Sequence, residues 1–193
     1  MTTTKAALLA AIDNLRTLVR NLPDDDSGGG EVGPITPVTL ARPPLLNQAS
    51  AYGATVRQVS TERPYWAITV ARHLLPDENK GRRSVFVQVF DANGWRVRDP
   101  RLRIMWTWTG RQPWEIAPPA ALDKVDGPLE LGHGNLDLYW GARLSVWIEG
   151  DGLPSDVVQN LHTMHPAELG LTSEKWNYEG HHSFYIRFQR VTQ

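Results

Sequence analysis

The stretch Ser84-Val85-Phe86-Val87-Gln88-Val89-Phe90-Asp91-Ala92-Asn93-Gly94 decides the fold class of this chain. Every second residue from Val85 to Val89 is valine, so one face of an extended segment is aliphatic. The Asn93-Gly94 pair that follows is typical of a tight hairpin turn, because these residues accept positive φ angles. A strand that ends in such a turn indicates a domain built from β-sheet.

The same alternation recurs on both sides of this stretch. We expect strand pairing to resume at Trp95 and further strands over residues 66–70, 104–108, 144–148 and 184–188. Shorter candidates are residues 52–59, 129–131 and 136–140. About seven or eight strands predict a mainly β fold, specifically an immunoglobulin-like β-sandwich. A small barrel is the alternative, and the chain has no cysteine, so the Cys-Trp-Cys pattern of antibody domains is missing.

Residues 1–22 show a helical period instead. An apolar stripe predicts a short amphipathic helix that needs a partner, since isolated helices of this length are marginal in water. Leu8, Leu15 and Leu22 repeat every seven residues, which favours a bundle of three or more helices; packing of the helix on its own β domain is the alternative. The predicted oligomerisation residues are Leu8, Ala11, Ile12, Leu15, Leu18, Val19 and Leu22.

A linker separates this helix from the β domain. Asp24 to Asp26, Ser27 and three glycines are followed by Pro34, Pro37, Pro43 and Pro44. Such a composition favours an extended tether over a compact return, which supports self-association or docking of the helix. The predicted organisation is a helix over residues 1–22, a Gly/Pro-rich linker over 23–50 and a β-sandwich domain over 51–193.

Composition narrows the partners. The net charge of −1 and the pI of about 6.6 give no electrostatic footprint for nucleic acid. The apolar run from Ala6 to Ile12 is too short for a convincing signal peptide, and no stretch reaches membrane-spanning length. We therefore expect no nucleic acid partner and no membrane span.

The histidines are the candidate metal ligands. His162, His165 and His182, with His181, Glu168 and Glu179 near them in sequence, supply enough nitrogen and oxygen atoms for a transition metal. Their spacing matches no metalloenzyme motif, so structural histidines are the preferred interpretation and the metal question stays open. No nucleophile elbow, phosphate loop or zinc-protease helix is present. We expect no cofactor and no enzymatic activity.

The eight tryptophans suggest a binding role, because aromatic rings stack on sugar rings. Trp66, Trp106 and Trp108 lie in predicted strand faces, which indicates the core. The candidate ligand contacts are those near turns, namely Trp95, Trp114, Trp140 and Trp176. The alternative for these four is that they close the ends of the sandwich.

Three stretches carry a resemblance to a known group of proteins. They are Arg72–Gly81 (RHLLPDENKG), Leu122-Asp123-Lys124, and Ser155–Val158 (SDVV) through His162–Pro166 (HTMHP) to His181–Tyr185 (HHSFY). Together they resemble uncharacterised immunoglobulin-like modules of bacteriophage and bacterial surface proteins, sometimes fused to lysozyme-like cell-wall hydrolases. The resemblance covers residues 65 to 190 and departs at Val125, where proline is expected. It implies adhesion or virion decoration and no catalytic residues.

Two functions are consistent with these features. The preferred expectation is a non-enzymatic structural or decorating subunit of a phage particle or surface assembly, a homo-oligomer that contacts capsid, tail or surface proteins. The alternative is a carbohydrate-binding adhesion module whose helix clusters several weak glycan sites. A metal-dependent enzyme is the third and weakest reading. The expected location is a virion or a cell-surface assembly.

Overall fold

The computed structural model describes residues 40–74, 76–79, 81–125, 132–164 and 182–192. The predicted N-terminal helix, with all its oligomerisation residues from Leu8 to Leu22, lies outside the described residues. So does the predicted linker as far as residue 39.

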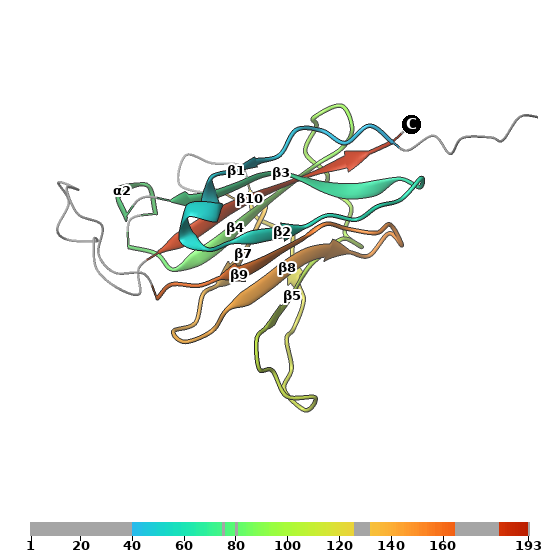
Figure 1. Ribbon diagram of the computed structural model, residues 1–193. Coiled ribbons are helices and arrows are strands. Elements are labelled where there is room, and N and C mark those ends of the chain that lie inside the picture. The colour runs from blue at the N-terminus through green and yellow to red at the C-terminus, as the bar shows by residue number, and fades with distance from the viewer. Residues whose placement is uncertain (1–39, 75, 80, 126–131, 165–181, 193) are drawn as a thin grey trace, which may run out of the picture. The chain divides into compact units, whose positions relative to one another are not determined.

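The described residues are mainly β and form two five-stranded sheets (Figure 1). The first sheet has the order β1 (Leu46–Asn47), β3 (Tyr65–Leu74), β10 (Ser183–Val191), β4 (Ser84–Phe90) and β7 (Gly134–Asp137). The second has the order β2 (Thr55–Arg57), β9 (Val157–Leu161), β8 (Leu144–Glu149), β5 (Arg103–Trp108) and β6 (Ala120–Ala121). Two short helices, η1 (Gln48–Tyr52) and α2 (Pro76–Asn79), complete the described elements.

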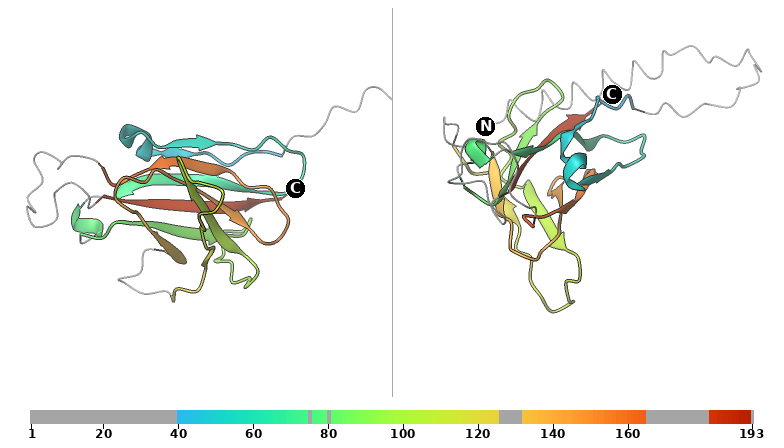
Figure 2. Two further views of the ribbon diagram at one scale, coloured as in Figure 1. Left: turned by 90° about the horizontal axis from the view of Figure 1, so that it is seen from below. Right: turned by 60° about the vertical axis from the view of Figure 1, so that its left-hand side comes forward.

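The two sheets lie one over the other and share one hydrophobic core (Figure 2). Val85, Val87 and Val89 are fully buried in it, as the alternation predicts. The second sheet also contributes to this core: Leu144, Val146 and Ile148 are the buried residues of β8. The predicted two-layer β architecture is therefore present, with two separate sheets in the described chain instead of the single closed sheet of a barrel. The immunoglobulin-like topology stays a prediction.

Strand β10 occupies the centre of the first sheet. It runs antiparallel to β3 and parallel to β4, so that Ile186 lies opposite both Ala71 and Val87. Its inward residues Phe184, Ile186 and Phe188 are fully buried. A strand from the far end of the described chain thus supplies the middle of the core.

The turn after β4 forms at the predicted place. Gly94 has a φ of 83°, and the Asp91 amide donates a hydrogen bond of 2.8 Å to the Trp95 carbonyl. Pairing beyond the turn is limited to a single bridge between Phe90 and Arg96. The chain then crosses to the second sheet, where β5 begins at Arg103.

A buried carboxylate fixes the edge of the second sheet. Asp156, directly before β9, accepts hydrogen bonds from the backbone amides of Val59 and Ile68, each 2.9 Å long. Its Oδ2 atom also lies 2.5 Å from Nη1 of Arg42. Because Val59 follows β2 closely and Ile68 belongs to β3, this carboxylate holds β2 and β3 against the start of β9.

Candidate functional site

The outward face of the second sheet carries the candidate site. Strand β8 turns Leu144, Val146 and Ile148 inward, so Ser145, Trp147 and Glu149 face outward. On the neighbouring strand β5, Thr107 lies opposite Ser145 and Met105 lies opposite Trp147. A tryptophan therefore stands among polar side chains on the face that does not contribute to the core.

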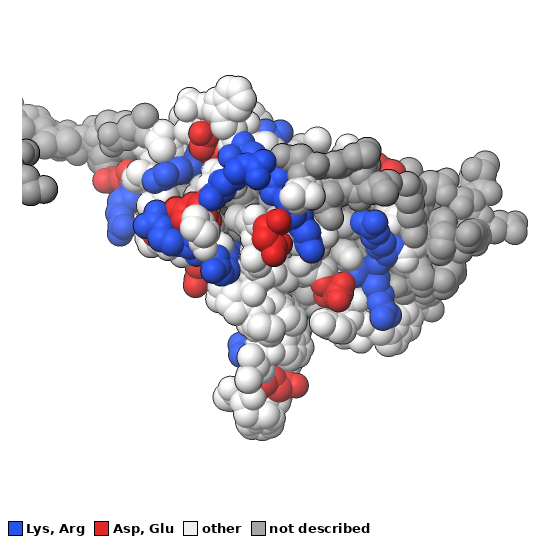
Figure 3. All heavy atoms as spheres, turned by 180° about the vertical axis from the view of Figure 1, so that it is seen from behind, with Lys and Arg blue, Asp and Glu red and all other residues white. Residues whose placement is uncertain are grey.

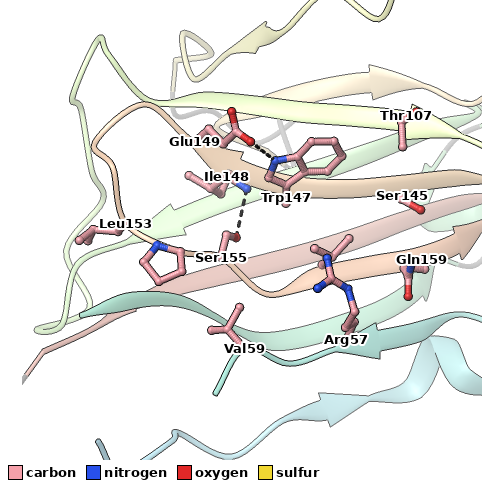
Figure 4. Close-up of a pocket in the computed structure, with 12 residues that line it drawn as sticks. Arg57, Val59, Thr107, Ser145, Trp147, Ile148, Glu149, Leu153, Ser155 and Gln159 are labelled. Atoms are coloured by element: carbon pink, nitrogen blue, oxygen red, sulfur yellow. Dashed lines mark hydrogen bonds between the residues drawn. The ribbon is translucent and has the colours of Figure 1, made fainter. Parts of the chain in front are cut away.

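A hollow of about 430 Å³ lies over this face (Figure 4). Strands β2, β5, β8 and β9 form its floor, and residues 153–155 form its rim. Its polar and aromatic lining residues are Arg57, Thr107, Ser145, Trp147, Glu149, Ser155 and Gln159. Small-molecule sites in proteins usually enclose about 300–1,000 Å³, so the hollow has room for a small ligand.

Trp147 is the central aromatic residue of the hollow. Its ring is half-buried, and its Nε1 atom donates a hydrogen bond of 2.6 Å to Oε1 of Glu149. Both residues lie on the outward side of β8, so this bond directs the polar edge of the indole along the strand toward Glu149 (Figure 4). The ring is thereby fixed in one orientation, with its nitrogen already occupied.

Four polar side chains near this ring have no partner in the described part of the chain. Arg57, Thr107, Ser145 and Gln159 line the hollow, and none of these side chains forms a hydrogen bond or ion pair with another described residue. They come from β2, β5, β8 and β9 respectively. The floor therefore presents donors and acceptors that are available to a ligand.

The rim, in contrast, is held by the protein itself. The Ser155 hydroxyl accepts a hydrogen bond of 3.2 Å from the Ile148 amide and donates one of 2.8 Å to the Asp156 carbonyl. The Leu153 amide donates to Oδ1 of Asp151 at 3.1 Å. The Ile148–Ser155 bond joins the β8–β9 connection to β8, and the other two bonds lie within the connection, so the rim keeps its position beside the hollow.

A bulge in β9 orients Gln159. Val158 and Leu161 both point into the core, which places two residues between them and gives Asn160 a φ of 63°. The Asn160 amide group stabilises this conformation, since Nδ2 donates to the Gly53 carbonyl and Oδ1 accepts from Nη1 of Arg143, each at 2.8 Å. The residue before the bulge, Gln159, is left on the outward face.

A second, apolar groove of about 390 Å³ lies beside the long β5–β6 loop. Trp106, Trp108, Ile116, Pro118, Tyr139 and Ala142 line it. The ring centroid of Trp106 lies 5.4 Å from that of Trp108 and 6.4 Å from that of Tyr139. Trp106 and Trp108 are half-buried at the edge of the core, whereas Trp66 is fully buried as predicted.

The predicted ligand contacts lie elsewhere than the hollow of Figure 4. Trp95 is 74% exposed at the turn after β4, Trp114 is 77% exposed in the β5–β6 loop, and Trp140 is 56% exposed before β8. None of these three lines the hollow, and Trp176 is outside the described residues. Trp147 was not among the predicted ligand contacts. The sequence did carry a signal for it, because Trp147 is an aromatic residue between Ser145 and Glu149 on the otherwise polar face of β8.

The histidines come together only in part. His162 and His182 are buried, and Nδ1 of His182 lies 2.7 Å from Nε2 of His73, whose ring stacks on Tyr52 at 3.7 Å. Burial lowers the pKa of His162, and the nearby charges of Arg143 and His182 lower it further. His165, His181, Glu168 and Glu179 lie outside the described residues. Within the ranges that the structure covers, no three metal-ligating side chains cluster.

Comparison with known proteins adds no relative. The chain matches no protein-family model, no curated protein and no solved structure. Among the described residues, no helix has the length and apolar character needed to cross a membrane.

Proposed function

We propose that this chain is a non-enzymatic binding module that recognises a glycan on the outward face of its second sheet. The supporting observation is the Trp147 ring, fixed by Glu149 and surrounded by side chains that have no protein partner in the described chain. A sugar ring has an apolar C–H face that stacks on an indole and a rim of hydroxyl groups that need hydrogen bonds. The hollow offers both kinds of contact on neighbouring strands.

The charged groups of the hollow support binding without hydrolysis. Glycoside hydrolysis usually requires two carboxyl groups on either side of the scissile bond. Of the described residues that line the hollow, Glu149 alone carries a carboxylate, and that carboxylate accepts the hydrogen bond from Trp147.

A shallow site of this kind binds each glycan weakly, so several copies on one surface would raise the overall affinity. The predicted N-terminal helix, with its stripe from Leu8 to Leu22, provides a means of holding several modules together. In this proposal the helix supplies avidity and the hollow supplies recognition.

A glycan array with the full chain tests the proposal. We expect saturable binding to one glycan class and a loss of about tenfold or more in Trp147→Ala, because stacking is removed. Trp95→Ala is the matched control, since Trp95 is more exposed and lies outside the hollow. Equal binding by the two variants, or no binding by the parent chain, would reject the proposal.

A structural or decorating subunit of a phage particle or surface assembly is the second candidate. The favouring observation is the group of exposed apolar side chains near the apolar groove: Trp114, Ile116, Tyr139 and Trp140. A neighbouring subunit would cover such a surface. Oxidative footprinting of the full-length oligomer is the test: Trp114 and Trp140 should be protected relative to Trp95, and equal oxidation of all three would count against this function.

A further inference from the structure

Arg57 gives the hollow a positive charge at one side. It is an exposed residue at the end of β2, and Figure 4 shows its guanidinium directed over the sheet toward Trp147. No carboxylate in the described residues pairs with it, in contrast to Arg42, Arg72 and Arg101, each of which forms an ion pair. The guanidinium is therefore available to an anion.

Glu149 lies at another side of the same hollow. Its Oε1 atom accepts the hydrogen bond of the Trp147 nitrogen at 2.6 Å, and Figure 4 shows it beside the indole along β8, whereas Arg57 lies on the β2 side. The two charges therefore border the indole on two different sides and do not form an ion pair with each other. A ligand lying on the ring would meet a cation on its β2 side and a carboxylate beside the ring along β8.

We propose, on the basis of the glycan site above, that the hollow selects acidic sugars, with the anionic substituent of the ring bound by Arg57. A guanidinium binds a carboxylate or a sulfate through two parallel N–H donors, which gives both strength and direction. Glu149 repels an anionic group and accepts hydrogen bonds from hydroxyls, so it disfavours the reversed orientation. One ligand orientation follows from the two charges together.

The other described Lys and Arg side chains lie outside the hollow. Figure 3 shows Lys and Arg side chains on the side of the molecule that faces away from the viewer of Figure 1, interspersed with Asp and Glu. Of the described Lys and Arg residues, Arg57 is the one that lines the hollow beside Trp147. The preference for an anion should accordingly depend on this single residue.

The test compares three oligosaccharides of equal length with the full chain: a uronic acid polymer fragment, its neutral counterpart and a sulfated form. Isothermal titration calorimetry should show binding to the acidic forms about tenfold tighter than to the neutral one, because a charge-assisted contact adds to stacking. The comparison of carboxylate with sulfate identifies which anion fits. The preference should decrease as salt is raised, since Arg57 is exposed.

Two variants separate this inference from the proposed function. Arg57→Gln should bind all three sugars with the weaker affinity of the neutral one, whereas Arg63→Gln, an exposed arginine of the following segment, should behave as the parent chain. An unchanged acidic preference in Arg57→Gln would overturn the inference while leaving glycan binding in place. Absence of binding to every sugar by the parent chain would instead remove the proposed function.

Discussion

Asp156 and Arg42 lie 114 residues apart in the sequence and are joined by two hydrogen bonds, of 2.5 and 3.1 Å. The Asp156 carboxylate is buried, and it also accepts the amides of Val59 and Ile68. One side chain therefore satisfies donors from three separate segments of the chain.

Asp156→Ala should lower the free energy of unfolding by about 3–5 kcal/mol, because it leaves buried donors and a partly buried guanidinium without their acceptor. Urea denaturation measures the change. Asp99→Ala is the control, since Asp99 is only partly buried and its partner Arg101 is exposed, so that the midpoint should change much less. Equal effects of the two substitutions would contradict the role assigned to Asp156.

Gly53→Ala should destabilise the protein more than Gly141→Ala. Both glycines have φ near 80°, so the backbone strain is similar, at about 1–2 kcal/mol. A Cβ on Gly53 would also lie 3.1 Å from Nδ2 of Asn160, whereas nothing lies within 4 Å of one on Gly141. The difference between the two urea midpoints measures the cost of the contact between the added Cβ and Asn160 in the β9 bulge. Identical midpoints would show that the bulge accommodates the Cβ without loss of stability.

Trp66→Ala should cost about 3–5 kcal/mol, because Trp66 is fully buried between the sheets and its removal leaves a cavity. Trp106→Ala should cost less, about 1–2 kcal/mol, since its ring lies at the half-exposed edge of the core. Thermal unfolding of both variants gives the comparison. A larger effect of the Trp106 substitution would mean that the groove is part of the central core.

The pKa of His162 is lowered in the folded state, so the unfolded chain binds a proton there more readily. Its contribution to stability is fully present above the ordinary pKa of about 6.5 and is lost as the pH falls from there toward the folded-state value. Urea midpoints measured between pH 7.5 and 5 should therefore decrease, with a smaller slope in His162→Gln. An unaltered slope in this variant would assign the effect to other groups.

Self-association is predicted to depend on the N-terminal stripe. Deletion of residues 1–30 should convert a multimer into a folded monomer, and Leu15→Asp should have nearly the same effect, because it places a charge in the apolar seam. Thr17→Asp, outside the stripe, should keep the mass of the parent chain. Multi-angle light scattering is the measurement, and an unchanged mass after the deletion would exclude the helix as the source of assembly.

The alternation of apolar and polar residues predicted where strands lie in the sequence, but not which strands pair with one another in a sheet. Alternation identifies Val85, Val87 and Val89 as one buried face because side chains in a strand have a period of two. The same pattern cannot show that β10 enters between β3 and β4, since pairing between distant strands depends on the whole core.

The site was harder to predict for a similar reason. Trp147 is visible in the sequence as an outward residue of β8, but its neighbours Arg57 and Gln159 come from strands that the sequence does not place beside it. Trp95 and Trp114 were predicted as ligand contacts instead, because they lie near turn residues in the sequence. In the structure both are exposed in loops. The extra residue that orients Gln159 was also hard to predict: asparagine accepts a positive φ, but the contacts that hold Asn160 at 63° come from Gly53 and Arg143 in other segments.

The central place of β10 also constrains how the chain is made. Thr69 of β3 contacts the Arg187 carbonyl of β10 across 118 residues, and β4 pairs with the other side of the same strand. During synthesis on the ribosome, β3 and β4 emerge long before their common neighbour, leaving two strand edges without a partner. The nascent chain is therefore exposed to aggregation until residues 183–191 have left the exit tunnel, and chaperone binding before that point would protect it.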